Sequence, residues 1–305
     1  MANVASLSKI LGRMSDIEHQ QVKKDFFGLI YGGYGTGKTT LIAGIAQKLK
    51  GDGRILFLDS SQGAAALDNM PKLKADIDWL PVRDPRELMV IAQAIKARKK
   101  IGNIDFSDYT VVLMDELDSW FEIILHDYVR EVTGTLPTED LPEIEGKHYA
   151  APTAATLNII NTLSSVDDLH IILTAHDQER GKEPRVMVSP SLPPKLMKGI
   201  NEKVHVVGRL EAVIAKDGYQ REIQVNPSKQ VVAKSRIGGL DVKVAFNALP
   251  KIVSEWVGSS QMEKDLIEKH PDPTPVADED VDTEEPDELD HVDDDEAVEV
   301  SDDED

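Results

Sequence analysis

The residues whose types and spacing predict chemistry most directly form a glycine-rich stretch that ends in Lys38 and Thr39. The stretch matches the pattern G-x-x-x-x-G-K-T, and it lies between an apolar run at 26–31 and a helical pattern at 39–49. Glycines let such a loop curl so that its backbone N–H groups face phosphate oxygens, and the following helix adds the positive end of its dipole. A glycine-rich turn that ends in Lys-Thr by chance is the weaker interpretation, because the flanking strand and helix are both present.

This loop predicts a site for ATP and Mg²⁺. We expect Lys38 to reach the β- and γ-phosphates and the Thr39 hydroxyl to ligate Mg²⁺. The residues expected to contact the nucleotide are Gly32, Gly33, Tyr34, Gly35, Thr36, Gly37, Lys38, Thr39 and Thr40.

Two carboxylates, Asp115 and Glu116, follow the apolar run at 111–114. We expect Asp115 to hold the metal shell and Glu116 to polarise the attacking water, as hydrolysis of a bound triphosphate requires. A strand that ends in Asp-Glu is common and usually marks a solvated loop. Its position downstream of the P-loop pattern favours the functional interpretation.

A third candidate is His176, which follows the apolar run at 170–174. An open α/β sheet presents its ligands outside the carboxyl ends of its strands, so Thr174 or His176 could sense the γ-phosphate. A surface or capping histidine is an equally good interpretation. Asp59, at the end of another apolar run, has the same ambiguity.

These residues need elements that bring them together, and the hydrophobic pattern supplies them. The runs predicted as buried strands are 26–31, 55–58, 111–114, 170–174 and 204–210. The stretches with helical spacing are 39–49, 85–100 and 153–163. This alternation predicts an α/β fold with a mostly parallel, doubly wound sheet and helices on both faces. Strands at 204–214, 220–226 and 231–234, with a turn at 217–218, predict an antiparallel C-terminal meander that continues the sheet.

Charge and composition divide the chain into three parts. Residues 271–305 hold 19 acidic residues and no Lys or Arg, and so carry nearly all of the formal net charge of -21. The predicted domains are therefore an N-terminal helical segment at 1–25, an ATPase domain at 26–258, and a linker with a disordered acidic tail at 259–305. The nearly neutral body leaves nucleic acid open as a partner, although the whole chain is strongly acidic.

Other functional classes are disfavoured. The sequence has no cysteine, no apolar stretch near the ~20 residues of a membrane span, and no apolar core of a signal peptide near its start. We expect a soluble, cytoplasmic protein without membrane partners, in the host cytoplasm if a phage encodes it.

With these elements in order, the chain resembles the RecA-like ATPases. Within them it is most similar to phage-encoded RecA-type nucleotide-binding proteins, which include single-strand annealing recombinases. The resemblance covers about 26–249, and beyond the P-loop it depends on the segment Val231-Val232-Ala233-Lys234-Ser235-Arg236-Ile237-Gly238-Gly239. It implies a RecA-like P-loop NTPase core.

The resemblance also implies roles for two cations. Lys234 and Arg236 would reach the ATP of a neighbouring subunit and stabilise charge on its γ-phosphate, which requires a homo-oligomer, either a ring or a filament. Solvated residues at a strand end are the alternative. The sequence departs from the family at Ser61, where RecA proteins carry the catalytic glutamate, so Glu116 is expected to take that role.

In RecA-like proteins, loops after the strands that end here at Asp115 and His176 bind DNA. Both places are expected to be long irregular segments, at 134–153 and 177–203. The second carries Arg180, Lys182, Arg185, Lys195, Lys198 and Lys203, but it lacks the aromatic residues on which bases stack. Ordinary surface charge is the alternative to DNA binding.

The resulting hypothesis is an ATPase that acts on single-stranded DNA in phage recombination, annealing or repair, with a single-strand DNA-binding protein as a further partner. One alternative is a helicase-loading or motor ATPase. Another is an assembly switch that hydrolyses ATP slowly. A small-molecule kinase is disfavoured, because the chain has no arginine-rich lid.

Overall fold

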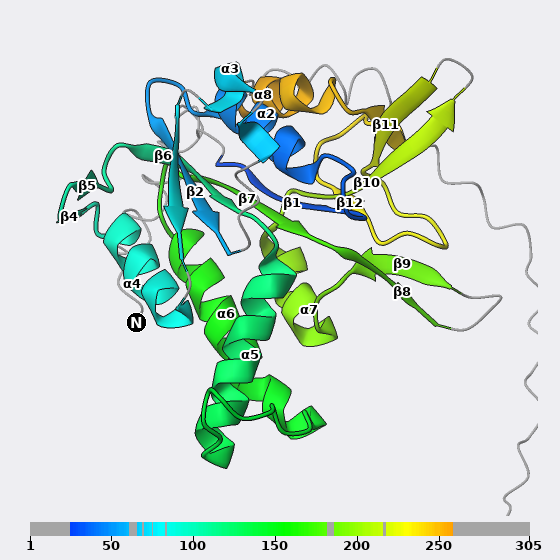
Figure 1. Cartoon of the computed structure of the whole chain (residues 1–305). Helices are drawn as coiled ribbons and strands as arrows, with labels where there is room; N and C mark the ends of the chain where they lie inside the picture. The colour runs from blue at the N-terminus through cyan, green and yellow to red at the C-terminus, as the bar shows by residue number, and fades with distance from the viewer. Residues whose placement is uncertain are drawn as a thin grey trace, which may run out of the picture.

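The computed structural model describes residues 25–60, 66–68, 70–74, 76–82, 84–181, 186–215 and 218–258. Within these residues a nine-stranded sheet lies between two layers of helices (Figure 1). The N-terminal segment, Ser61 and the acidic tail lie outside the described residues, so the expectations for them are not addressed by the structure.

The centre of the sheet is parallel, with the strands in the order β10-β1-β7-β6-β2-β3. The strands are β1 (Phe27–Tyr31), β2 (Arg54–Asp59), β3 (Ile77–Pro81), β6 (Tyr109–Met114), β7 (His170–Ala175) and β10 (Val206–Ala215). Most of their residues are apolar and buried, because helices cover both faces. The parallel arrangement puts the carboxyl ends of β1, β7, β6 and β2 along one edge.

The sheet continues beyond β10 with antiparallel strands. β11 (Gly218–Gln224) pairs with β10, and β13 (Lys243–Ala245) pairs with β11. The two-residue strand β12 (Lys234–Ser235) pairs with the first residues of β10. The expected meander is present, but its outer strand is β13 rather than 231–234.

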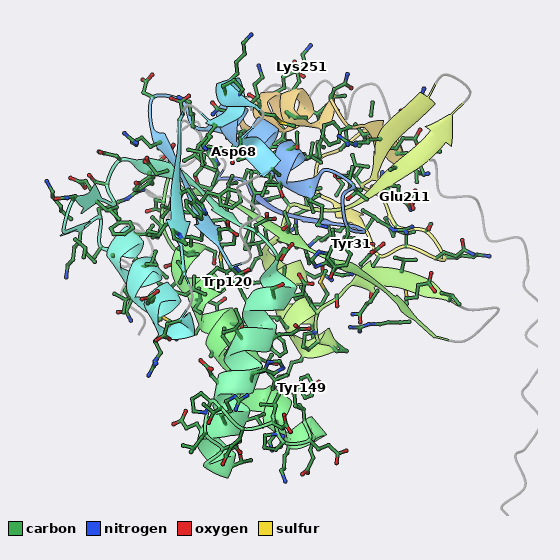
Figure 2. The ribbon with its side chains drawn as sticks, viewed as in Figure 1. Tyr31, Asp68, Trp120, Tyr149, Glu211 and Lys251 are labelled. Carbon is green, nitrogen blue, oxygen red and sulfur yellow. The ribbon has the colours of Figure 1, made fainter. Side chains whose placement is uncertain are left out.

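The helices lie on both faces of the sheet. One face carries α2 (Lys38–Leu49), α3 (Pro71–Lys74) and α8 (Leu249–Gly258), and the other carries α4 (Pro85–Lys96), α5 (Leu117–Thr133), α6 (Ala150–Leu163) and α7 (Pro194–Lys203) (Figure 1). Successive strand residues face opposite layers: Leu29 packs with the α4–α7 layer and Ile30 with the α2 layer. Trp120 of α5 is fully buried beneath the sheet (Figure 2).

The expected fold class is confirmed: a mostly parallel, doubly wound α/β sheet with helices on both faces, as in a RecA-like P-loop NTPase core. Apart from the strand expected at 231–234, the predicted strands and helices are present, with shifted ends. The helix expected at 85–100 ends at Lys96, because Arg98 adopts a left-handed φ of 48° and Lys100 begins the hairpin of β4 (Lys100–Ile101) and β5 (Ile104–Asp105).

The expectation of an irregular segment at 177–203 was wrong. β8 (Asp177–Arg180) and β9 (Met187–Pro190) form a hairpin, and α7 follows with Pro194 in its first turn. Neither strand is buried on both faces, so the hairpin lacks the apolar run that marks the central strands. Likewise, 134–153 contains a 3₁₀ turn (Gly146–Tyr149) and the start of α6.

Candidate functional site

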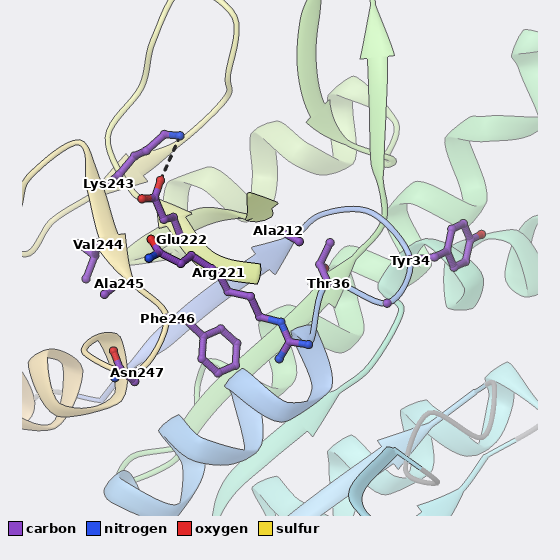
Figure 3. A pocket seen from close by; sticks show the side chains of 12 residues that line it. Tyr34, Thr36, Ala212, Arg221, Glu222, Lys243, Val244, Ala245, Phe246 and Asn247 are labelled. Atoms are coloured by element: carbon purple, nitrogen blue, oxygen red, sulfur yellow. Dashed lines mark ion pairs between the residues drawn. The ribbon is translucent and has the colours of Figure 1, made fainter. Parts of the chain in front are cut away.

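The P-loop connects the end of β1 to the first turn of α2, and its geometry requires glycine at two places. A Cβ on Gly32 would lie 2.3 Å from the carbonyl oxygen of Leu210. Gly37, which precedes α2, has a φ of 101°, and a Cβ there would lie 3.1 Å from Nη1 of Arg221, whose side chain reaches the loop from β11 (Figure 3). At both positions the P-loop backbone lies too close to its neighbours for a side chain, and its conformation favours glycine. The loop can therefore curl tightly around the N-terminus of α2.

Lys38 folds back over this curl. Its ammonium donates hydrogen bonds of 3.0 Å to the carbonyls of both Gly32 and Gly33, and the residue is 7% exposed. Burial lowers the pKa of Lys38, while the neighbouring carboxylates, led by Asp115, oppose that shift. The ammonium is therefore held at the mouth of the loop, where an anionic ligand would replace the carbonyls as its partner.

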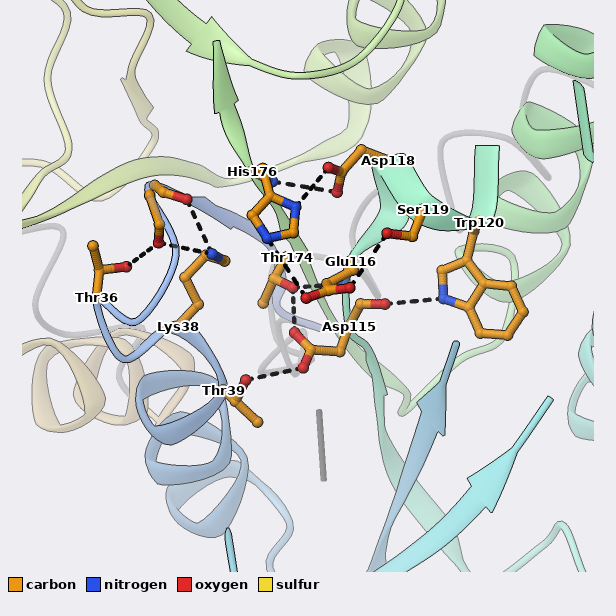
Figure 4. A network of polar contacts seen from close by, with 12 residues as sticks. Thr36, Lys38, Thr39, Asp115, Glu116, Asp118, Ser119, Trp120, Thr174 and His176 are labelled. Atoms are coloured by element: carbon orange, nitrogen blue, oxygen red, sulfur yellow. Dashed lines mark hydrogen bonds and ion pairs between the residues drawn. The ribbon is translucent and has the colours of Figure 1, made fainter. Parts of the chain in front are cut away.

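Asp115 links the P-loop helix to the ends of two strands. It accepts a hydrogen bond of 2.9 Å from the Thr39 hydroxyl and a second from the Thr174 hydroxyl (Figure 4). The residue is 1% exposed, and burial raises the pKa of its carboxyl group. The sequence placed Thr39 and Asp115 far apart along the chain, and the fold brings their oxygens into contact.

The Thr39 hydroxyl and the Asp115 carboxylate are ligands suited to a hard, oxygen-preferring cation. No group of three or more His, Cys, Asp or Glu side chains that could hold a metal occurs among the described residues. A Mg²⁺ ion at Thr39 and Asp115 would therefore take its other ligands from phosphates and water, which is how Mg²⁺ binds in sites that receive phosphate substrates.

Glu116 and His176 lie next to this pair. Glu116 adopts a left-handed φ of 54°, and its backbone N–H donates to the Thr174 hydroxyl at 2.8 Å. Nε2 of His176 is 3.5 Å from Oε1 of Glu116, but it is buried and makes no hydrogen bond. With this backbone conformation the Glu116 carboxylate lies beside His176 and accepts a hydrogen bond from the Ser119 hydroxyl at 3.3 Å.

The orientation of His176 depends on Asp118, which the sequence analysis did not identify. The imidazole Nδ1 lies 2.8 Å from Oδ2 of Asp118, and the His176 backbone N–H donates to Oδ1 at 3.2 Å (Figure 4). Asp118 sits in the first turn of α5, three residues after Asp115. The run Asp115-Glu116-Leu117-Asp118 was the available signal, because residues three apart at a helix start can face the same site.

Tyr34, at the tip of the P-loop, contacts the same histidine. The centroids of the Tyr34 and His176 rings are 4.0 Å apart and tilted by 32°, although Tyr34 is 84% exposed. The P-loop tip therefore touches His176, one of the two strand-end residues expected as candidates for sensing the γ-phosphate.

The comparison with protein families agrees with this geometry. The model of an AAA domain family, AAA_24, matches residues 25–237, which include the P-loop, Asp115 and His176. This chain belongs to that AAA domain family. No curated protein matches it. The crystal structure of the flagellar accessory protein FlaH from Methanocaldococcus jannaschii is similar at 13% identity, covering 76% of this chain and 88% of that chain, with a TM-score of 0.39.

The chain thus carries an AAA-type P-loop ATPase domain. Among its described residues, no helix is long and apolar enough to cross a membrane.

Not every expected site residue of this AAA domain lies near the P-loop. Lys234 donates to the carbonyl of Asn201, and Arg236 donates to that of Glu202 at 2.8 Å, so both cations bind the last carbonyls of α7. The backbone N–H of Arg236 donates to the carbonyl of His205, and the backbone N–H of His205 donates to the carbonyl of Phe27 at the beginning of β1. The P-loop follows the other end of β1, about 15 Å further along the sheet.

Two other expectations have structural explanations. Asp59 accepts a hydrogen bond of 2.8 Å from the indole of Trp79, so it fixes a residue of β3. Thr36 donates to the carbonyl of Gly33 at 2.9 Å and stabilises the loop itself, and Thr40 lies in the first turn of α2.

Proposed function

We propose that this AAA domain binds ATP with Mg²⁺ and hydrolyses it. The observation that carries the proposal is the Thr39–Asp115 hydrogen bond, with Glu116 beside it at the same sheet edge. The backbone of 32–37 and the Lys38 ammonium would hold the phosphates, and the Thr39 hydroxyl and Asp115 would hold Mg²⁺ and its water shell.

In this proposal Glu116 is the base that polarises the attacking water. It is the carboxylate next to the metal pair with a partly exposed side chain, whereas Asp115 is almost fully buried. His176, oriented by Asp118, would contact the γ-phosphate or the water through its unpaired Nε2. A base within reach of the water and a positioned polar partner are what the hydrolytic step requires.

We further propose a homo-oligomer in which Lys234 and Arg236 act on the ATP of the next subunit. Their separation from their own P-loop supports this, because neither can reach the phosphates bound by its own chain. Within their own subunit both cations donate hydrogen bonds to carbonyls at the C-terminal end of α7, and an approaching triphosphate could replace these carbonyls. A cation at the γ-phosphate stabilises charge in the transition state.

We propose single-stranded DNA as the macromolecule on which the ATPase acts, in phage recombination, annealing or repair, together with a single-strand DNA-binding protein. Arg180 at the end of β8 and three lysines of α7 support this proposal, because they gather positive charge on one hairpin and helix. The three are Lys195, Lys198 and Lys203. Lys182 and Arg185, also expected to contribute, lie outside the described residues.

Two other functions use the same site. A helicase-loading or motor ATPase would couple hydrolysis to movement of DNA or a partner protein. An assembly switch would bind ATP and hydrolyse it slowly. DNA stimulation and turnover rate distinguish them from the first proposal.

The test is ATP turnover by the purified protein with and without single-stranded DNA, for wild type, Lys38→Ala and Arg236→Ala. Lys48→Ala, an exposed lysine of the same helix as Lys38, is the control for a lost charge. We expect DNA to stimulate wild type, both site variants to lose activity, and an equimolar mixture of the two to recover part of it. A turnover rate that changes neither with DNA nor with Arg236→Ala would favour the loader or the switch. Turnover that is unchanged in Lys38→Ala would refute the nucleotide site.

A further inference from the structure

A cavity of about 910 Å³ lies beside the P-loop, on the side of the antiparallel strands (Figure 3). Gly35 and Thr36 of the P-loop form one wall, and β11 with residues 243–247 forms the other. Its volume is within the range of small-molecule sites. A ligand whose phosphates lie on the loop has room for its remaining part here.

The far wall of this cavity carries a stacked pair, Arg221 and Phe246. The Arg221 guanidinium carbon lies 5.5 Å from the centroid of the Phe246 ring, and the Phe246 backbone N–H donates to the Arg221 carbonyl at 3.1 Å. The same guanidinium reaches the backbone of Gly37. We call this pair the Arg221–Phe246 platform. Planar guanidinium and aromatic groups are the surfaces on which nucleobases stack.

The platform is fixed relative to the P-loop helix. Phe246 precedes α8, which packs along α2 through the fully buried Leu249 and Val253. The hydroxyl of Ser254 also donates to the carbonyl of Lys48 at the end of α2, at 3.4 Å. The distance between the platform and the phosphate-binding loop is therefore set by helix packing rather than by a free loop.

Part of this wall, residues 243–247, also lies outside the part of the chain that the family model matches, whereas β11 with Arg221 lies inside it. That match ends at residue 237, whereas β13, Phe246 and α8 follow it. The segment after residue 237 therefore supplies Phe246, and the matched region supplies Arg221, which lies beside Gly37 of the P-loop.

We propose that this cavity binds the base of the nucleoside triphosphate, which stacks on the Arg221–Phe246 platform. The inference rests on the proposed ATP site and adds the subsite that tells a nucleotide from bare phosphates. A purine covers more of a stacking surface than a pyrimidine does, so ATP binds more tightly than CTP, and both bind more tightly than inorganic tripolyphosphate.

The test is calorimetric titration of the full chain with ATP, CTP and tripolyphosphate in the presence of Mg²⁺. The variants are Arg221→Lys, which keeps the charge but removes the plane, and Phe246→Leu, which keeps apolar volume but removes the ring. Arg221 is exposed, so its variant is expected to fold even if Phe246→Leu is unstable. Lys251→Ala, on the exposed side of α8, is the control.

We expect each platform variant to weaken ATP binding roughly tenfold, in line with the loss of one stacking contact, and to change tripolyphosphate binding less than twofold. Equal losses for ATP and tripolyphosphate, or no loss for either, would overturn the base subsite. Lys38→Ala separates a failure of the base subsite from a failure of the proposed function. If Lys38→Ala weakens the binding of both ATP and tripolyphosphate while the platform variants change neither affinity, only the base subsite is wrong. If wild type binds neither ligand, both proposals fail.

Discussion

At the scale of single residues, each side chain of the site has a different environment and therefore a different expected role. Asp115 is buried and bonded to two hydroxyls, Glu116 has a left-handed backbone and lies beside His176, and His176 is held by Asp118. This division predicts that the three acidic residues differ in what their loss does to binding and to turnover.

Replacing Glu116 with Gln should lower kcat by roughly 100-fold or more, because the amide cannot accept the proton of the attacking water. The affinity for ATP should stay within about twofold, since Lys38 and the loop backbone remain. Steady-state turnover and nucleotide titration measure both quantities. Glu122→Gln, an exposed glutamate of α5, is the control. A Glu116→Gln enzyme with unchanged kcat would exclude this residue as the base.

Replacing Asp118 with Asn should lower kcat while leaving ATP affinity nearly unchanged. The amide removes the carboxylate partner of Nδ1, so His176 loses its fixed tautomer and orientation; a misplaced group of this kind costs up to roughly 100-fold in rate. The measurement is kcat beside the ATP dissociation constant, with Asp127→Asn on the exposed side of α5 as the control. A loss of affinity without a loss of kcat would contradict the positioning role.

At the scale of elements, the packing of α8 on α2 connects the C-terminal part of the domain to the P-loop. Leu249 and Val253 have no exposed surface, and they join the cluster that contains Leu41, Ile42 and Ile45 of α2. Because α8 has only ten residues, most of its stability comes from this packing rather than from its own hydrogen bonds.

Leu249→Ala should therefore lower the free energy of unfolding by about 2–5 kcal/mol, as expected for a fully buried leucine. Chemical denaturation followed by circular dichroism measures the change. Lys251→Ala, on the exposed side of the same helix, should change stability by less than about 0.5 kcal/mol. Equal effects of the two substitutions would mean that α8 does not pack on α2 in solution.

At the scale of the whole molecule, charge is distributed unevenly. The last 35 residues, 271–305, carry 19 acidic side chains, whereas the ATPase domain carries Arg180 of β8 and the lysines of α7. We propose that the acidic segment competes with nucleic acid for these basic residues, which makes its effect dependent on salt. A segment that only keeps the protein in solution is the alternative.

Ending the chain at residue 270 should tighten binding to single-stranded DNA, by roughly tenfold at low salt and less at high salt, because screening weakens the competition. Fluorescence anisotropy with a labelled oligonucleotide measures the affinity at both salt concentrations. A chain of full length whose acidic residues after 270 are changed to Asn and Gln should behave like the shortened one. Unchanged affinity in both would exclude competition by the tail.

The sequence alone determined the parts of this protein that depend on local pattern. The P-loop, its strand and its helix follow from glycine spacing and periodicity, and Asp115 follows from an apolar run that ends in carboxylates. The parallel sheet follows from the alternation of strands and helices. The sequence patterns did not predict α5, because only the strand before it was recognised from its apolar run. They also did not predict the hairpin after His176, because its strands are partly exposed and lack such a run.

Only the tertiary structure decided which distant residues meet. It brings Asp118 to His176 and Tyr34 to the same ring, and it puts Arg221 beside Gly37 and Phe246 beside Arg221. It also moves Lys234 and Arg236 away from their own P-loop, through the register of β12 on β10. Strand order and helix packing set these contacts, and both arise from burying apolar surface between elements far apart in the chain, which local spacing does not encode.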